Sequence, residues 1–224
     1  MKLAERLEQA RAADPSRIAG KGEAPELQYT HTGRISALLR AAGRVDMVIG
    51  GCGTGQGYMN AVMQYPGVTC GHLLTSLDAF LFARINAGNV ISLSLNQGWG
   101  WAGDENLRLL FDQLFTDALG QGFPAHRQEP QRASRERLTL ISRVAHRPMD
   151  EIVARLPDEI LLPALAHPEA AAVLDMDTIA DAALRTALQA LSQKLGAVEW
   201  NADLGQYELI ADATTRGQFQ QWLR

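Results

Sequence analysis

The apolar residues of this chain fall in short continuous runs that alternate with stretches of helical periodicity. The run at 45–50 has continuous rather than alternating apolar residues, which is typical of a buried strand. Short runs at 67–71 and 89–95, bounded by Gly or Asn, favour two more strands. Helical stretches accompany these runs at 32–42, 76–84 and 105–119. Strands that alternate with helices of this length predict βαβ units. We therefore expect an α/β fold with a mainly parallel sheet and flanking helices.

The last third of the chain has a different pattern. Leucines recur there at helical spacing, at Leu184, Leu188, Leu191 and Leu195. Asp177 or Thr178 is available to cap the start of this helix. Residues 199–207 instead favour a hairpin that turns at 203–205. We expect a first domain at 1–134 and a mostly helical extension at 135–224.

Composition narrows the class of protein. The 224 residues are 46% hydrophobic and 21% charged, which is typical of a folded globular chain. A net charge of −4 and a pI of about 5.7 argue against a nucleic-acid partner. Two cysteines are too few for a disulfide framework and favour a reducing compartment. The start is charged, and no apolar membrane segment follows. We expect a cytoplasmic protein without a membrane partner.

One segment is unusually rich in glycine. Residues 50–57 read Gly-Gly-Cys-Gly-Thr-Gly-Gln-Gly, five glycines in eight residues between an expected strand and a short helix at 58–64. Glycines allow several backbone N–H groups to converge on one point. A helix N-terminus adds partial positive charge there. This pattern predicts a site for an anion, or for an oxygen that becomes anionic.

Several familiar sites are excluded by Tyr58. A Walker loop requires Gly-Lys-Ser/Thr at its end, and Tyr58 follows the last glycine. The dinucleotide fingerprint requires a third glycine where Tyr58 stands. A cysteine phosphatase would have an arginine at the same position, six residues after Cys52. The histidines and cysteines show no zinc-ligand spacing, so we expect no metal.

Cys52 is the reactive candidate in this loop. Converging N–H donors lower the pKa of a thiol, and a thiolate there can act as nucleophile or general base. The alternative is that Cys52 is a small residue that packs a tight turn, and the residues alone leave both open. Cys70, at the end of an expected strand, is expected to be buried packing.

Three segments together resemble one known family. Residues 51–57, Pro-Gly-Val at 66–68 and Asn-Ala-Gly-Asn-Val at 86–90 are similar to the type B ribose-5-phosphate isomerase and galactose-6-phosphate isomerase family. The resemblance runs from about residue 29 to 132. It implies a Rossmann-like fold and an aldose–ketose isomerase of phosphorylated pentoses or hexoses that uses no metal or other cofactor. It also implies a homodimer or homotetramer whose active sites are shared between subunits.

The resemblance assigns roles by position. Cys52 matches the cysteine that moves a proton between neighbouring carbons, and Thr54 matches a threonine implicated in ring opening. The backbone around Gly53, Gly55 and Gly57 would stabilise the enediolate. The implied substrate-binding side chains are Tyr29, His31, Asn86, Asn89, Arg127 and Arg132. Two structural alternatives stay open: Thr54 as a cap of the next helix, and Asn89 as the closure of a turn.

The chain also departs from the family pattern. Ile85 and Ala87 stand where the family has the histidine and aspartate of His-Asn-Asp, and that histidine is tied to ring opening. Either His31 or His72 replaces it, or the substrate is already open-chain, although His72 by itself is typical of a solvated loop histidine. The family's opening strand is not recognisable, and Arg127 and Arg132 are spaced by five rather than four. Ile85 and the missing opening strand favour a second hypothesis, a non-catalytic sugar-phosphate-binding protein.

Overall fold

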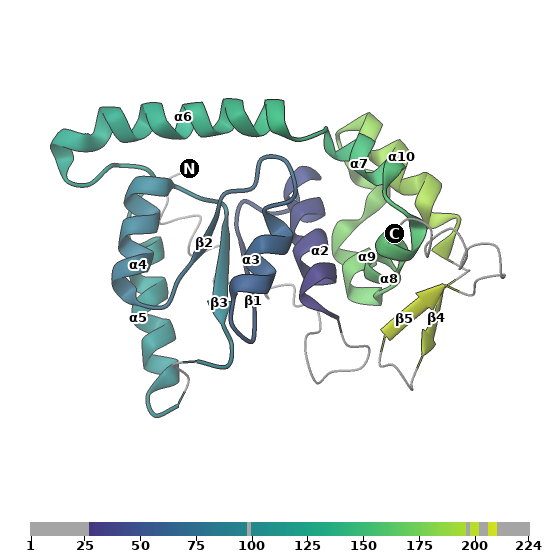
Figure 1. The fold of residues 1–224 in the computed structure, drawn as a ribbon, viewed down its shortest axis with the longest axis horizontal. Coiled ribbons are helices and arrows are strands. Elements are labelled where there is room, and N and C mark those ends of the chain that lie inside the picture. The colour runs from purple at the N-terminus through teal and green to yellow at the C-terminus, as the bar shows by residue number, and fades with distance from the viewer. Residues whose placement is uncertain (1–26, 98–99, 196–197, 202–205, 210–224) are drawn as a thin grey trace, which may run out of the picture. The chain divides into compact units, whose positions relative to one another are not determined.

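A computed structural model describes residues 27–97, 100–195, 198–201 and 206–209 (Figure 1). The chain divides into two compact units, and we describe each by itself. The described part of the first unit is 45–147, and that of the second is 27–44 together with the residues from 148 onward. The boundary expected after residue 134 falls inside one continuous helix, α6 (Gln128–Ala145), and the division at 134 stays a prediction.

The first unit is built on a parallel three-stranded sheet in the order β1-β3-β2. Its strands are β1 (Val48–Cys52), β2 (Cys70–His72) and β3 (Val90–Ser94). Because the strands are parallel, all three end at one edge of the sheet, which we call the carboxyl edge, and begin at the other, the amino edge. Cys52 lies opposite Ser94 in the register, and His72 lies opposite Ser92.

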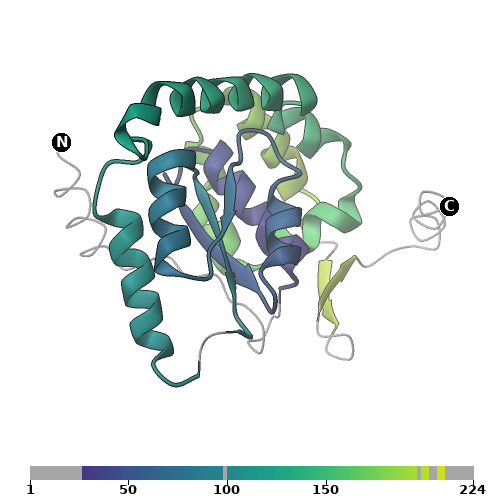
Figure 2. The ribbon, with the colours of Figure 1, turned by 60° about the vertical axis from the view of Figure 1, so that its left-hand side comes forward.

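Helices cover both faces of this sheet (Figure 2). The face that carries Ile91 and Leu93 packs against α4 (Ser76–Leu81) and α5 (Gly103–Phe115) through a cluster that includes Phe82, Leu110 and Leu114. The other face packs against α3 (Gln56–Val62), whose Tyr58 is fully buried. This arrangement confirms the predicted Rossmann-like α/β fold with a parallel sheet and flanking helices.

The expected helix at 76–84 changes character part-way. After α4, residues Phe82–Asn86 form a π-helical segment, η1, which ends at Ala87 in the left-handed conformation. The loop after α5 is tied to η1, because the N–H groups of Gly120 and Gly122 donate to the carbonyls of Ala83 and Arg84. This loop continues through the short 3-10 helix η2 (Ala125–Arg127) into α6.

The second unit is mostly helical. It contains α2 (Tyr29–Ala41), α7 (Met149–Arg155), α8 (Asp158–Leu165), α9 (Pro168–Leu174), the 3-10 helix η3 (Met176–Thr178) and α10 (Ala182–Ser192). The antiparallel strands β4 (Val198–Asn201) and β5 (Gln206–Leu209) follow, which confirms the predicted strand pair. The predicted turn at 203–205 lies outside the described residues. The predicted leucine stripe is buried at Leu184, Leu188 and Leu191.

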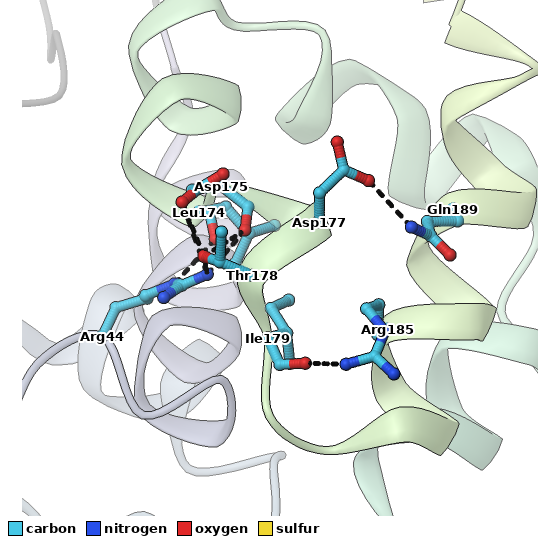
Figure 3. Close-up of polar contacts among 8 residues, drawn as sticks. All are labelled: Arg44, Leu174, Asp175, Asp177, Thr178, Ile179, Arg185 and Gln189. Atoms are coloured by element: carbon cyan, nitrogen blue, oxygen red, sulfur yellow. Dashed lines mark hydrogen bonds and ion pairs between the residues drawn. The ribbon is translucent and has the colours of Figure 1, made fainter.

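Arg44 makes polar contacts with the segment from Leu174 to Thr178 in the second unit (Figure 3), and a separate residue caps α10. Arg44 donates from Nε to the carbonyl of Leu174 at 2.9 Å and from Nη2 to the Asp175 carbonyl and the Thr178 hydroxyl. Asp181 caps α10 by accepting from two backbone N–H groups. The prediction of Asp177 or Thr178 as this cap is wrong, because η3 intervenes and α10 begins later.

Candidate active site

Cys52 is the last residue of β1, at the carboxyl edge, and residues 53–55 lead directly from it to α3. Gly55 forms the N-cap of α3 with φ +74, a left-handed conformation that favours glycine. Thr54 therefore does not cap α3, and its hydroxyl instead hydrogen-bonds the thiol of Cys52. The tight turn holds this thiol close to the first N–H groups of the helix.

The surroundings favour the thiolate form of Cys52. Burial by itself raises the pKa of the Cys52 thiol, but hydrogen bonds from the backbone N–H groups of Tyr58, Thr54 and Gly55 and from the Thr54 hydroxyl outweigh it, so that the pKa is lowered. Burial without such donors raises the pKa of Cys70 to about 12. Of these two thiols, only Cys52 has the environment of a base or nucleophile.

Hydroxyl groups of β3 support the loop from below. Ser94 Oγ donates to the Thr54 carbonyl at 2.7 Å, and Ser92 Oγ donates to the Gly55 carbonyl. Both serines are almost completely buried. His72 Nε2 lies 2.7 Å from Ser94 Oγ. His72 is thus a half-buried strand residue with a defined partner, and the prediction of a solvated loop histidine is wrong.

Ser92 and Ser94 are not among the residues predicted for the site. A signal for them exists, because two serines two residues apart interrupt an apolar strand and so lie on the same face. Polar residues on one face of a buried strand require partners, and here those partners are the carbonyls of the glycine-rich loop.

Asn86 and Asn89 come just before β3, so they lie at the amino edge of the sheet. Cys52 is the last residue of the parallel strand β1 and lies at the opposite, carboxyl edge. Asn89 closes the turn before β2: its Oδ1 accepts from the N–H of Thr69 at 3.0 Å, and its Nδ2 donates to the carbonyl of Gly67 at 2.8 Å. Within one chain the sheet therefore separates these residues from Cys52.

The two expected arginines stand at the start of α6. Arg127 ends η2 and is exposed, and Arg132 pairs with Glu129 at 2.7 Å on the helix surface. The same helix is anchored to η1 by Arg135, which donates to the carbonyls of Ile85 at 2.8 Å and Gly120 at 3.0 Å. The start of α6 and the end of η1 thus form one connected segment.

Comparison with known proteins identifies the family. The sequence model of the Ribose/Galactose Isomerase family matches residues 2–114, half of the chain. The chain belongs to this family. It is therefore a sugar isomerase, an intramolecular oxidoreductase, and the resemblance read from the motifs is confirmed.

Two solved structures are similar over most of the chain. A 4-deoxy-L-threo-5-hexosulose-uronate ketol-isomerase complexed with a tartrate has 28% identity and a TM-score of 0.75, with 85% of this chain and 92% of the other covered. A ribose-5-phosphate isomerase from Vibrio parahaemolyticus has 32% identity and a TM-score of 0.69, with 76% and 79% covered. Among curated proteins, no sequence matches the chain.

The remaining candidates of this isomerase belong to the second unit. Tyr29 is the first residue of α2, and His31 Nδ1 accepts from the Gln28 N–H at 3.4 Å. Burial and, to a lesser extent, the charge of Arg34 lower the pKa of His31 to about 4, so this imidazole is neutral at pH 7. The relation of Tyr29 and His31 to Cys52 stays a prediction.

In the described part of the isomerase, no group of three or more His, Cys, Asp or Glu side chains could hold a metal ion. No helix within the same residues is long and apolar enough to cross a membrane.

Proposed function

We propose that this isomerase interconverts an aldose and a ketose, with Cys52 as the general base, and that its substrate is a phosphorylated pentose or hexose. The observation that carries the proposal is the thiol at the carboxyl edge, whose pKa is lowered by the backbone N–H groups around it. The carboxyl edge of a parallel sheet is also where α/β proteins generally bind ligands.

The proposed reaction moves one proton between two carbons and one between two oxygens of the substrate. The Cys52 thiolate takes a proton from the hydroxyl-bearing carbon next to the carbonyl, and the electron pair moves onto the carbonyl oxygen as an enediolate. A proton passes from the neighbouring hydroxyl to this oxygen, and the thiol returns its proton to the former carbonyl carbon, so that the product is an isomer of the substrate. The N–H groups at 53–57 are suited to stabilise the negative oxygen, because glycine leaves them unobstructed.

The distribution of charged residues along the chain supports an active site that is completed by a second copy of the protein. Asp, Glu, Lys and Arg are all missing from 47–77 and from 85–103, the stretches that contain all three strand ends. Arg127 and Arg132 belong instead to the segment connected with η1. We propose a homodimer or homotetramer in which these arginines and Asn86 serve the Cys52 of a neighbouring copy and bind the anionic group of the substrate.

Ile85 favours a second class of substrate. An isoleucine cannot transfer a proton, so ring opening lacks the group that the family places there. A substrate that is already open-chain needs no such group. The similar ketol-isomerase is named for a uronate, which carries a carboxylate rather than a phosphate. An open-chain sugar acid is therefore the alternative substrate for the same Cys52 chemistry.

Proton NMR in D₂O tests both classes. The protein is incubated with ribose 5-phosphate, allose 6-phosphate, galactose 6-phosphate and 4-deoxy-L-threo-5-hexosulose uronate. We expect deuterium to enter one substrate at the carbon next to the carbonyl. Cys52→Ala should lower this exchange by about 10²–10⁴-fold, and Cys70→Ala is the matched control.

Three outcomes separate the hypotheses. Exchange that depends on Cys52 supports the isomerase and identifies its sugar. Saturable binding of a sugar phosphate without any exchange supports the non-catalytic binding protein instead. Full exchange by Cys52→Ala refutes the role of Cys52 while leaving the isomerase in place.

A further inference from the structure

His72 and Ser94 lie beneath the glycine-rich loop and have no role in the proton transfer described above. We infer that His72 is a positioning residue: through Ser94 it fixes the Thr54–Gly55 peptide so that the peptide N–H faces Cys52. This inference rests on the proposed function, in which the Cys52 thiolate is the base.

The sheet register places the three side chains in a row. Cys52 on β1 is paired with Ser94 on the central strand β3, and His72 on β2 is paired with Ser92, two residues before Ser94. Paired residues of neighbouring strands point to the same face, and strands lie about 4.8 Å apart. Thiol, hydroxyl and imidazole thus share one face at the carboxyl edge, beneath the loop.

The peptide between Thr54 and Gly55 links this row to the thiol. In a trans peptide, C=O and N–H point in opposite directions. Ser94 holds the Thr54 carbonyl at 2.7 Å, so the Gly55 N–H of the same peptide is turned the other way. That N–H hydrogen-bonds Cys52, both at its thiol and at its carbonyl oxygen, which lies 3.1 Å away.

The direction of each proton follows from the partners. The Thr54 carbonyl can only accept, so it takes the single proton of Ser94 Oγ. Ser94 Oγ can then only accept from His72 Nε2. His72 therefore carries a proton on Nε2, and the hydrogen bonds run in one direction from His72 through Ser94 to Thr54.

Packing adds a second restraint. A Cβ at Gly55 would overlap Nε2 and Cδ2 of His72, so the imidazole lies directly against the Gly55 backbone. Ser94 is 1% exposed, and without His72 its oxygen would lose a donor where water has little access. His72 therefore supports the loop both by contact and by hydrogen bonding.

Alkylation of Cys52 measures the effect without any turnover. In a Cys70→Ala background, the rate of reaction with iodoacetamide is followed against pH, and the modified Cys52 peptide is quantified by mass spectrometry. We expect His72→Ala and Ser94→Ala each to raise the midpoint by about one pH unit, which is about tenfold less thiolate below the midpoint. His72→Gln, whose amide can donate to Ser94, should keep the parental midpoint.

A matched histidine–serine pair provides the control. His146 Nδ1 lies 3.2 Å from Ser142 Oγ on α6, in the same unit. His146→Ala removes a comparable hydrogen bond and should leave the Cys52 midpoint unchanged. Unchanged midpoints in both His72→Ala and Ser94→Ala would overturn the inference. A midpoint in His72→Gln as high as in His72→Ala would overturn the hydrogen-bonded part of it.

The tautomer of His72 is tested on the unaltered protein, so the result does not depend on any variant folding. Long-range ¹H–¹⁵N NMR of histidine-labelled protein should show the proton of neutral His72 on Nε2, and a proton on Nδ1 instead would contradict the inference. The proposal that Cys52 is the base and the inference that His72 is a positioning residue can be refuted independently. Active Cys52→Ala refutes the base but leaves the alkylation shifts standing, whereas unshifted midpoints refute His72 and leave the base standing.

Discussion

Replacement of Gly55 by alanine is expected to separate backbone strain from the contact with His72. Gly55 has φ +74, and a Cβ there would overlap the imidazole of His72. Gly67, in the same unit, has φ +71, and a Cβ there would meet nothing within 4 Å. Gly67→Ala is thus a matched control that shares the backbone conformation and lacks the overlap.

The expected magnitudes follow from these two environments. Alanine in the left-handed region costs about 1–2 kcal/mol of folding free energy. Alanine also lowers the conformational entropy of the unfolded chain, which stabilises the folded protein by about 0.4–1 kcal/mol. Gly67→Ala should therefore destabilise the protein by about 1 kcal/mol. Gly55→Ala also displaces His72 and weakens the hydrogen bonds from His72 to Ser94 and from Ser94 to Thr54. At about 0.5–1.5 kcal/mol each, these bring the total to about 2–4 kcal/mol.

Urea unfolding of the two variants, with linear extrapolation, measures the difference. A double-mutant cycle with His72→Ala then isolates the overlap with the imidazole, because Gly55→Ala should cost less in that background than in the parent. The remaining difference from Gly67→Ala is the tight contact with the Leu93 backbone carbon at 3.2 Å, which His72→Ala does not remove. Equal losses of stability for Gly55→Ala and Gly67→Ala would refute this prediction, because the contact between His72 and Gly55 would then contribute nothing to the free energy of unfolding.

Three further substitutions test parts of the fold by urea unfolding. Ala87→Gly should stabilise the first unit by about 0.5–1 kcal/mol, because Ala87 has φ +48; a loss of stability would contradict this. Asn89→Ala should destabilise by about 1–3 kcal/mol by removing the hydrogen bonds to Thr69 and Gly67, and an unchanged midpoint would refute its role in the turn. Asp181→Ala should cost about 1 kcal/mol through loss of the α10 cap, and Asp177→Ala, which leaves that cap intact, is its control.

The central strand β3 was predictable because burial leaves a local signature in the sequence. All five residues of β3 are buried, and the apolar run at 89–95 shows it. The partner of a helix leaves no such signature. Residues 32–42 were expected among the helices of the sheet, yet α2 belongs to the second unit, where it contacts α8 and α9. Periodicity specifies which face of a helix is buried but not what covers it.

The π-helical end of the expected helix at 76–84 also depends on distant residues. The carbonyls of Ala83 and Arg84 are satisfied by Gly120 and Gly122, more than thirty residues later. Contacts of this kind are long-range, and a local pattern does not contain them. The Asp181 cap is local, since it binds the N–H groups of Ala183 and Leu184, but a cap is recognised from sequence only when the start of its helix is known.

The placement of the candidate residues at the two edges of the sheet, in contrast, could have been predicted from the sequence. Cys52 follows an expected strand and Asn86 precedes one, and in a parallel sheet these positions lie at opposite edges. The order of motifs along the chain therefore implies two separate half-sites. The resemblance assigned both sets to one shared site without showing that a single copy separates them.

The separation of the two edges also separates the proposed proton transfer from the proposed binding of the substrate anion. In the proposed reaction, the thiol that moves the proton and the serine hydroxyls that hold the Thr54 and Gly55 carbonyls lie within residues 52–94 of one copy. His72, which contacts Ser94, lies in the same stretch. Every fixed cation that we propose for the substrate anion lies on η2 and α6. On this proposal, we expect a change at Arg127 or Arg132 to alter which anion is held and to leave the Cys52 thiol as it is. The proposal thus assigns the choice of substrate and the proton transfer to different parts of the chain, which a second copy would bring together.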